Sequence, residues 1–119
     1  MRKQYGEHFY QHLKRAKSAK LEFQCADITK PLDFADGSFD LVVCKGAMDA
    51  VLCAGRASAL SMVKECARLL APGHGIFFLV TNGNPDSRLE YLERENVLTG
   101  DSAYWRGVSV HVVEHNGKK

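Results

Sequence analysis

The sequence predicts a single α/β domain built on a parallel sheet. Two short apolar runs without alternation, at 41–43 and 76–80, suit strands that are covered on both faces. Between them, Leu60, Val63, Ala67 and Leu70 repeat at three- and four-residue steps, which predicts an amphipathic helix over 57–70. A strand, a helix and a further strand in this order are typical of α/β folds.

Length and composition limit the class of protein. The chain has 119 residues, enough for one domain over 1–119 but not for two. Its 45% hydrophobic and 25% charged residues are ordinary for a globular protein, and no apolar run approaches the ~20 residues of a membrane span. No secretory signal follows the basic N-terminus. A net charge of +2 is too small to identify a nucleic-acid partner.

The cysteines indicate a reducing compartment. None of Cys25, Cys44, Cys53 and Cys66 forms a Cys-x-x-Cys pair, and each lies in an apolar stretch. We therefore expect buried, reduced thiols rather than disulfides or a metal site. This pattern is typical of a cytoplasmic protein, with a nuclear location as the alternative.

The N-terminal segment, 1–17, reads as a basic amphipathic helix. One face carries the apolar and aromatic positions, namely Tyr5, Phe9, His12, Leu13 and Ala16. The basic residues favour a solvated face whose cations complement the helix dipole. Nucleic-acid binding is the weaker interpretation, because no aromatic platform accompanies the charges.

The next segment, Leu21 to Ala26, alternates and predicts a strand that ends at Asp27-Ile28. Asp36-Gly37-Ser38 then predicts a turn before the strand at 41–43. Lys45-Gly46 follows that strand, at the end where open α/β sheets bind ligands.

The second half of the sequence contains clear signals for the starts and ends of helices. A short helical turn is expected over 48–54, interrupted by Gly55, with Ser58 as a candidate cap for the next helix. Pro72-Gly73 ends that helix, and Asn84-Pro85 starts a short one that runs to about residue 94. The alternation over 104–113 predicts another strand, with Trp105 as core filler.

The run Asp-Gly-Ser-Phe-Asp-Leu-Val-Val, followed by Lys45-Gly46 and Met-Asp-Ala-Val, resembles the fourth-strand motif of class I S-adenosylmethionine-dependent methyltransferases. It is most similar to the small eukaryotic methyltransferase-like proteins that include lysine methyltransferases of translation elongation factor one alpha. Their version reads Asp-Lys-Gly-Thr-Leu-Asp-Ala, whereas Cys44 replaces the first aspartate here and Ala47-Met48 replaces Thr-Leu. The similarity extends in order over about residues 1–113.

This resemblance implies a transferase that moves a methyl group from S-adenosylmethionine to a protein lysine. Asp27 would accept a hydrogen bond from the adenine amino group and Ile28 would pack on the base. Lys45 would line the cofactor pocket, and Gly46 would allow close approach. From the residues alone, an Asx-turn before Pro31 is the preferred interpretation of Asp27, and only the Lys45 motif downstream shifts the preference slightly to the adenine contact.

No catalytic residue is assigned from the sequence. Asp49 is a weak candidate for a general base, and an acid favoured by the dipole at a helix N-terminus is the preferred interpretation of it.

The resemblance also implies a Rossmann-like sheet of seven strands, with a Gly-rich loop after the first and an acid after the second. The sequence contains neither feature, so we expect an N-terminally truncated domain that also lacks the last strand. The remaining strands would re-pair as a sheet of about four, or a partner chain or oligomer would complete it. The alternative function is a non-catalytic methyltransferase-like interaction module or pseudoenzyme.

Overall fold

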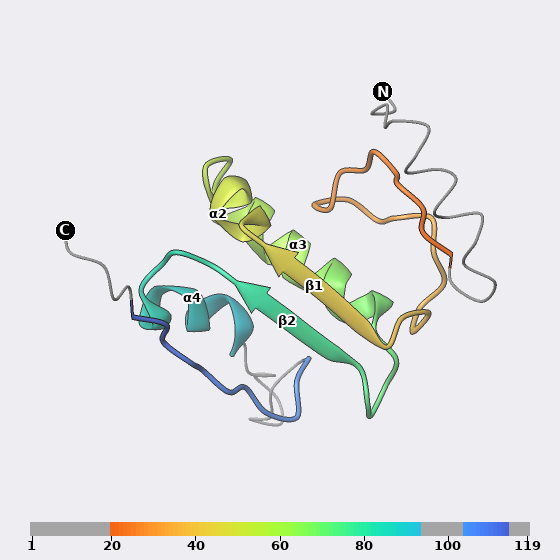
Figure 1. Cartoon of the computed structure of the whole chain (residues 1–119). Coiled ribbons are helices and arrows are strands. Elements are labelled where there is room, and N and C mark those ends of the chain that lie inside the picture. Colours follow the sequence, from red (N-terminus) through yellow and green to blue (C-terminus); the bar gives the residue numbers. More distant parts are fainter. Residues whose placement is uncertain (1–19, 94–103, 115–119) are drawn as a thin grey trace, which may run out of the picture.

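The computed structural model describes residues 20–93 and 104–114 of the chain (Figure 1). The elements are β1 (Leu41–Lys45), α2 (Ala47–Leu52), α3 (Arg56–Leu69), β2 (Ile76–Val80) and α4 (Pro85–Leu92). The helix predicted over 1–17 lies outside the described residues. No helix in the described ranges is long and apolar enough to cross a membrane.

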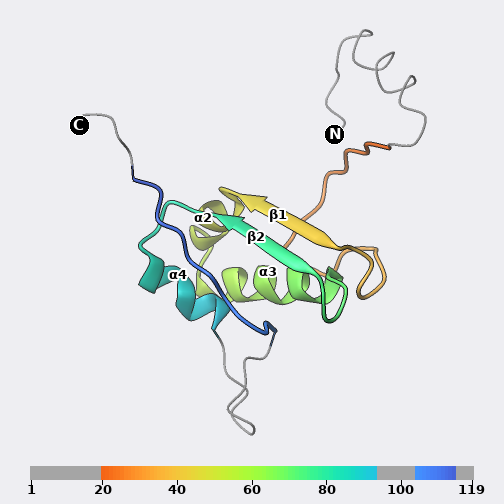
Figure 2. The same cartoon turned by 60° about the horizontal axis from the view of Figure 1, so that its bottom comes forward.

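The two strands form a parallel pair in register. Leu41 lies opposite Ile76, and Lys45 lies opposite Val80. The predicted strands at 41–43 and 76–80 and their parallel arrangement are therefore confirmed. Helix α3 makes the crossover and lies beneath the pair, with α4 beside it (Figure 2).

The core lies between the covered face of the pair and the helices. Met48, Met62, Val63 and Cys66 are fully buried there, and Tyr91 of α4 joins them. Side chains at alternate strand positions, which include Val42 and Leu79, point into this layer. Trp105 packs on the same core, stacked on Phe77 with ring centroids 5.4 Å apart, as predicted for a core filler.

The opposite face of the pair is exposed. Its side chains are those of Leu41, Val43, Ile76, Phe78 and Val80. The prediction that both faces of each strand are covered is therefore wrong for the described residues. An unbroken apolar run shows that a strand tolerates burial on both faces, but it does not supply the second layer.

Two further predicted strands do not form within the described ranges. Residues 21–26 and 104–113 belong to no ladder, so the described sheet has two strands rather than about four. Alternation favours an extended backbone, but a strand also needs a hydrogen-bonded neighbour. Neither segment forms a ladder with a described strand, and most of their side chains are exposed.

The turn before β1 and the cap of α4 both form where they were predicted. Gly37 has a φ of 68°, and the Ser38 hydroxyl donates to the Ala35 carbonyl at 2.7 Å, which confirms the turn at 36–38. The Asn84 side chain accepts a hydrogen bond from the Asp86 amide at 2.9 Å and caps α4 as predicted.

Helix α3 starts earlier than predicted. Its N-cap is Gly55, with a φ of 119°, and Ser58 lies inside the helix, so Ser58 is not the cap. Glycine tolerates this positive φ without strain, and the backbone turn alone therefore fixes the start of the helix.

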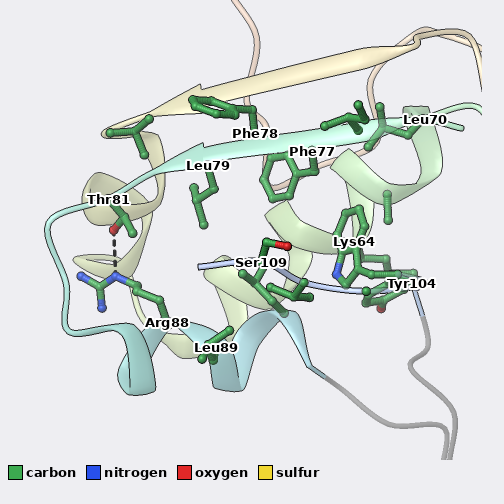
Figure 3. A pocket seen from close by; sticks show the side chains of 18 of the residues that line it. Lys64, Leu70, Phe77, Phe78, Leu79, Thr81, Arg88, Leu89, Tyr104 and Ser109 are labelled. Carbon is green, nitrogen blue, oxygen red and sulfur yellow. Dashed lines mark hydrogen bonds between the residues drawn. The ribbon is translucent and has the colours of Figure 1, made fainter. Parts of the chain in front are cut away.

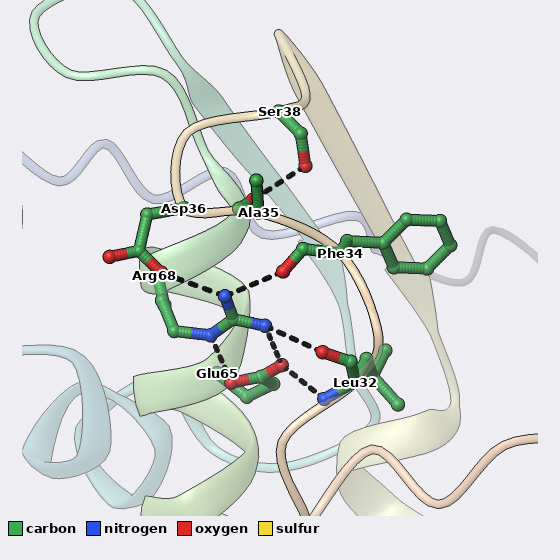
Figure 4. Close-up of polar contacts among 7 residues, drawn as sticks. All are labelled: Leu32, Phe34, Ala35, Asp36, Ser38, Glu65 and Arg68. Atoms are coloured by element: carbon green, nitrogen blue, oxygen red, sulfur yellow. Dashed lines mark hydrogen bonds and ion pairs between the residues drawn. The ribbon is translucent and has the colours of Figure 1, made fainter.

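One arginine fastens the loop before β1 to α3 (Figure 4). The Arg68 guanidinium donates through all three nitrogens: to the Glu65 carboxylate at 2.6 and 2.7 Å, to the carbonyls of Leu32 and Phe34, and to Asp36. Glu65 is buried and also accepts from the Leu32 amide at 2.7 Å. The hydrogen bonds from Arg68 hold the pKa of Glu65 below its ordinary value.

We predict that Arg68→Ala lowers the free energy of unfolding by about 3 kcal/mol, because it leaves the buried Glu65 carboxylate without its cation. Arg56→Ala is the matched control, since Arg56 lies on the same helix and pairs with Glu90 in the open. That exposed pair should contribute about 1 kcal/mol or less. Urea denaturation of both variants measures the difference, and equal losses would contradict the assignment.

The cysteines divide into two classes. Cys44 and Cys66 are buried as expected, but Cys25 and Cys53 are exposed, so burial of all four is wrong. All four are free thiols. The hydrogen bond between the two buried thiols raises the pKa of Cys66, and burial raises it further.

We predict that a thiol reagent modifies Cys25 and Cys53 rapidly in the native chain and reaches Cys44 and Cys66 only after denaturation. The control is a variant that carries both Cys25→Ser and Cys53→Ser, which should show no rapid phase. Rapid modification of either remaining cysteine in that variant would contradict the packing of β1 on α3.

Candidate functional site

The carboxyl ends of β1 and β2 meet at one edge of the sheet. Lys45 is the last residue of β1 and Gly46 follows it, while Thr81-Asn82 follows β2, and the parallel register places these residues side by side. The Gly46 amide donates to the Val80 carbonyl at 3.0 Å, which carries the pairing one step beyond the strands. Ligands of open α/β sheets bind at this kind of edge.

Gly46 forms the sharp turn from β1 into α2. Its φ of 74° is left-handed and favours glycine, and it is the N-cap residue of the helix. A Cβ placed on this residue would meet no atom within 4 Å. The backbone here therefore borders open space, and another molecule can approach it closely.

Lys45 projects from the exposed face of the pair. It is itself exposed, and it shares the strand face of Leu41 and Val43, four and two positions back. Its ammonium is therefore available at the rim, on the side of the sheet away from α3.

Asp49 lies in α2, the helix that follows β1, and links it to the loop that follows β2. Its carboxylate accepts from the Thr81 hydroxyl at 2.5 Å, from Arg88 Nη2 at 3.0 Å, and from the Asn82 amide. Arg88 in turn donates through Nε to the Thr81 hydroxyl at 2.9 Å, the contact drawn in Figure 3. The hydrogen bond from Thr81, followed by those from Arg88 and Asn82, lowers the pKa of Asp49.

These contacts decide between the two interpretations of Asp49. It lies in the first turn of α2, as the preferred interpretation has it. A carboxylate with a lowered pKa and three donors is a weak proton acceptor. Asp49 therefore fastens the loop after β2 to α2. Thr81 and Arg88 gave no signal in the sequence, because they lie 32 and 39 positions from Asp49.

We predict that Asp49→Asn lowers the free energy of unfolding at neutral pH by about 2 kcal/mol, through loss of the charge-assisted hydrogen bonds. The pKa of Asp49 is lowered in the folded chain, so this stabilisation is present above its ordinary value of 3.8 and is lost as the pH falls through the lowered value. The urea midpoints of variant and parent should converge at acid pH.

The matched control is Asp86→Asn, which removes an exposed acid from the first turn of α4. It should change stability by less than about 1 kcal/mol. A loss in Asp49→Asn that stays constant from neutral to acid pH would contradict the charged network.

Asp27 and Ile28 lie in a turn before β1. The Asp27 carboxylate accepts from the Thr29 amide at 3.0 Å and from its hydroxyl at 2.6 Å, which lowers its pKa and makes the Asx-turn. Asp27 is exposed, and Ile28 is half-buried against the core cluster. That Asp27 and Ile28 contact adenine remains a prediction.

A groove of about 2190 Å³ lies on the other side of β2 and shares Thr81, Asn82 and Arg88 with this edge. Phe77, Leu79 and Leu89 line it, with Lys64 and Arg88 nearby (Figure 3). Of the described residues that line it, none is Asp27, Ile28, Lys45 or Gly46. The predicted cofactor residues therefore lie outside this groove.

Comparison with known proteins gives one match. A family model described as a methyltransferase domain matches residues 5–79, a range that contains β1, α2 and α3 and ends within β2. No curated protein and no solved structure matches the chain significantly.

Proposed function

The chain belongs to the methyltransferase domain family, whose members bind S-adenosylmethionine as methyl donor, and on this premise we propose that the carboxyl edge of β1 and β2 forms part of the cofactor site. The observation that carries the proposal is the open space beside the Gly46 backbone. The adenine ring of an adenosyl group is flat, and a rim without side chains lets it approach the backbone at the strand end.

Four residues would hold the cofactor. Gly46 would allow the cofactor to approach the backbone closely, and the exposed Lys45 ammonium would line the same edge of the sheet. Asp27 would accept from the adenine amino group, because an ionised carboxylate has about four lone-pair sites and Thr29 supplies two donors. Ile28 would contact the base with the part of its side chain that the core leaves uncovered.

The bound cofactor supplies an electrophilic methyl group on a sulfonium centre. The contribution of this chain is positioning, because an in-line displacement depends on holding donor and acceptor in line. Asp49 serves this role indirectly by fixing the loop after β2 at the same edge. The acceptor must arrive deprotonated, and no side chain is assigned to take its proton.

For the acceptor, a protein lysine is our proposal. Its support is the resemblance of the Lys45-Gly46 region to the lysine methyltransferases of translation elongation factor one alpha. Transfer of labelled methyl groups from S-adenosylmethionine to a cell extract, followed by protein hydrolysis, tests it. Label in methyllysine supports the proposal, and label in another methylated residue or in nucleic acid contradicts it.

The second candidate is a non-catalytic module of the same family. One observation favours it: Asp49, the acid in the first turn of α2 after Gly46, already accepts hydrogen bonds from Thr81 and Arg88. Cofactor binding without methyl transfer to any acceptor would support this candidate.

We predict that S-adenosylhomocysteine binds the purified chain and that Gly46→Ala weakens the binding by about tenfold or more, since a methyl group would occupy the rim. Gly55→Ala is the matched control: Gly55 also has a positive φ and open surroundings, so alanine there introduces backbone strain away from the site. Isothermal titration calorimetry measures both.

Side-chain variants extend this test. Lys45→Ala and Asp27→Ala should each weaken binding, whereas Lys20→Ala, which changes an exposed lysine paired with Glu22, should not. Absence of heat at millimolar ligand, or equal affinities in all variants, would contradict a cofactor site at this edge.

A further inference from the structure

The loop that follows β2 contains the dipeptide Asn82-Gly83. In an asparagine-glycine pair the next backbone nitrogen reaches the side-chain carbonyl most easily, because glycine has no Cβ to obstruct the approach. The dipeptide lies between Thr81, whose hydroxyl donates to Asp49, and the start of α4. It therefore belongs to the stretch of chain that fixes the carboxyl edge of the sheet.

The structure leaves both reacting groups of this pair accessible. The Asn82 side chain is exposed, and neither its carboxamide nor the Gly83 amide makes a hydrogen bond to any described residue. The Asn82 backbone amide is held instead, since it donates to the Asp49 carboxylate at 3.2 and 3.3 Å. No contact in the described ranges therefore opposes the approach of the Gly83 nitrogen to the Asn82 side chain.

A second asparagine in the same loop provides the contrast. Asn84 is also exposed, but its side-chain oxygen accepts a hydrogen bond from the Asp86 amide at 2.9 Å. The residue after it is Pro85, whose nitrogen carries no hydrogen. The loop therefore contains one asparagine that can react with the next nitrogen and one that cannot.

We propose that Asn82 is a site of spontaneous deamidation in the folded chain, and that its products loosen the loop after β2. The Gly83 nitrogen attacks Asn82 Cγ and forms a bond with it, and the side-chain nitrogen leaves as ammonia with the proton of the Gly83 amide. Water then opens the resulting succinimide. Addition at Cγ gives aspartate, and addition at the backbone carbonyl carbon gives isoaspartate, whose main chain runs through the former side chain.

Both products disturb the contacts that hold this loop. Aspartate at position 82 places a second carboxylate on the residue whose amide already contacts the carboxylate of Asp49. Isoaspartate lengthens the main chain next to Gly83, which packs so tightly on the Arg88 guanidinium that an added Cβ would collide with it. Arg88 reaches back from α4 to Thr81 (Figure 3) and to Asp49. A shift of Gly83 therefore weakens both contacts, whether or not cofactor is bound.

Mass spectrometry of the full chain tests the modification after incubation at mildly alkaline pH. Trypsin releases residues 69–88 as one peptide that contains both asparagines, and fragment ions between them assign the change. The other asparagine-glycine pair, at 116–117, falls in the separate peptide 107–118. We expect loss of Asn82 to a mixture of aspartate and isoaspartate, with Asn84 intact. Retention of Asn82, or equal loss at Asn84, would overturn the proposal.

A comparison of rates tests the part played by the fold. The reaction at Asn82 should proceed below and above the urea unfolding transition at rates that agree within about tenfold, since the folded loop needs no local opening to react. A much slower reaction in the folded chain would show that the fold protects the site, and it would overturn the proposal.

Two variants test the link to Asp49. Asn82→Asp should lower the folded-to-unfolded ratio by about fivefold through like-charge repulsion. Asn82→Gln is the matched control: it keeps a neutral carboxamide, should leave this ratio close to that of the parent chain, and should slow the deamidation. Equal stability of the two variants would contradict the proposed loosening of the loop.

Discussion

The parallel pairing of β1 with β2 is the constraint on which the rest of the structure depends. Because the strands are in register, both carboxyl ends reach the same edge, and the Gly46 amide extends the pairing to the Val80 carbonyl. The crossover through α3 follows from this geometry, since parallel neighbours cannot be joined by a tight turn. The rim is open because Gly46, which has no side chain, forms the turn between the last residue of β1 and the first residue of α2.

Two polar clusters hold this pair in place from opposite ends. Arg68 and Glu65 fasten the loop that enters β1, and Asp49 with Arg88 fastens the loop that leaves β2. Each cluster joins segments more than 30 positions apart in the chain. Charge-assisted hydrogen bonds are directional, so they fix the loops where apolar packing alone would leave them free to shift. A rim for a small ligand needs this kind of support.

Sequence reasoning succeeded where the signal was local. The apolar runs, the turn at Gly37 and the Asn84 cap each depend on a few neighbouring residues, and each was placed correctly. Pairing was not predictable in the same way, because alternation over 21–26 favours an extended backbone without naming a partner. The Asp49 cluster was missed for the same reason: Thr81 and Arg88 become its neighbours only when the strands pair.

The central claim is that the paired strand ends border the adenosyl group. Amide chemical-shift mapping of the labelled chain during addition of S-adenosylhomocysteine tests this most directly. The account predicts that the largest shifts lie in residues 45–49 and 81–83, with smaller ones at Asp27 and Ile28. Shifts confined to the part of the groove formed by residues 85–92 and 104–114, or none at saturating ligand, would contradict it.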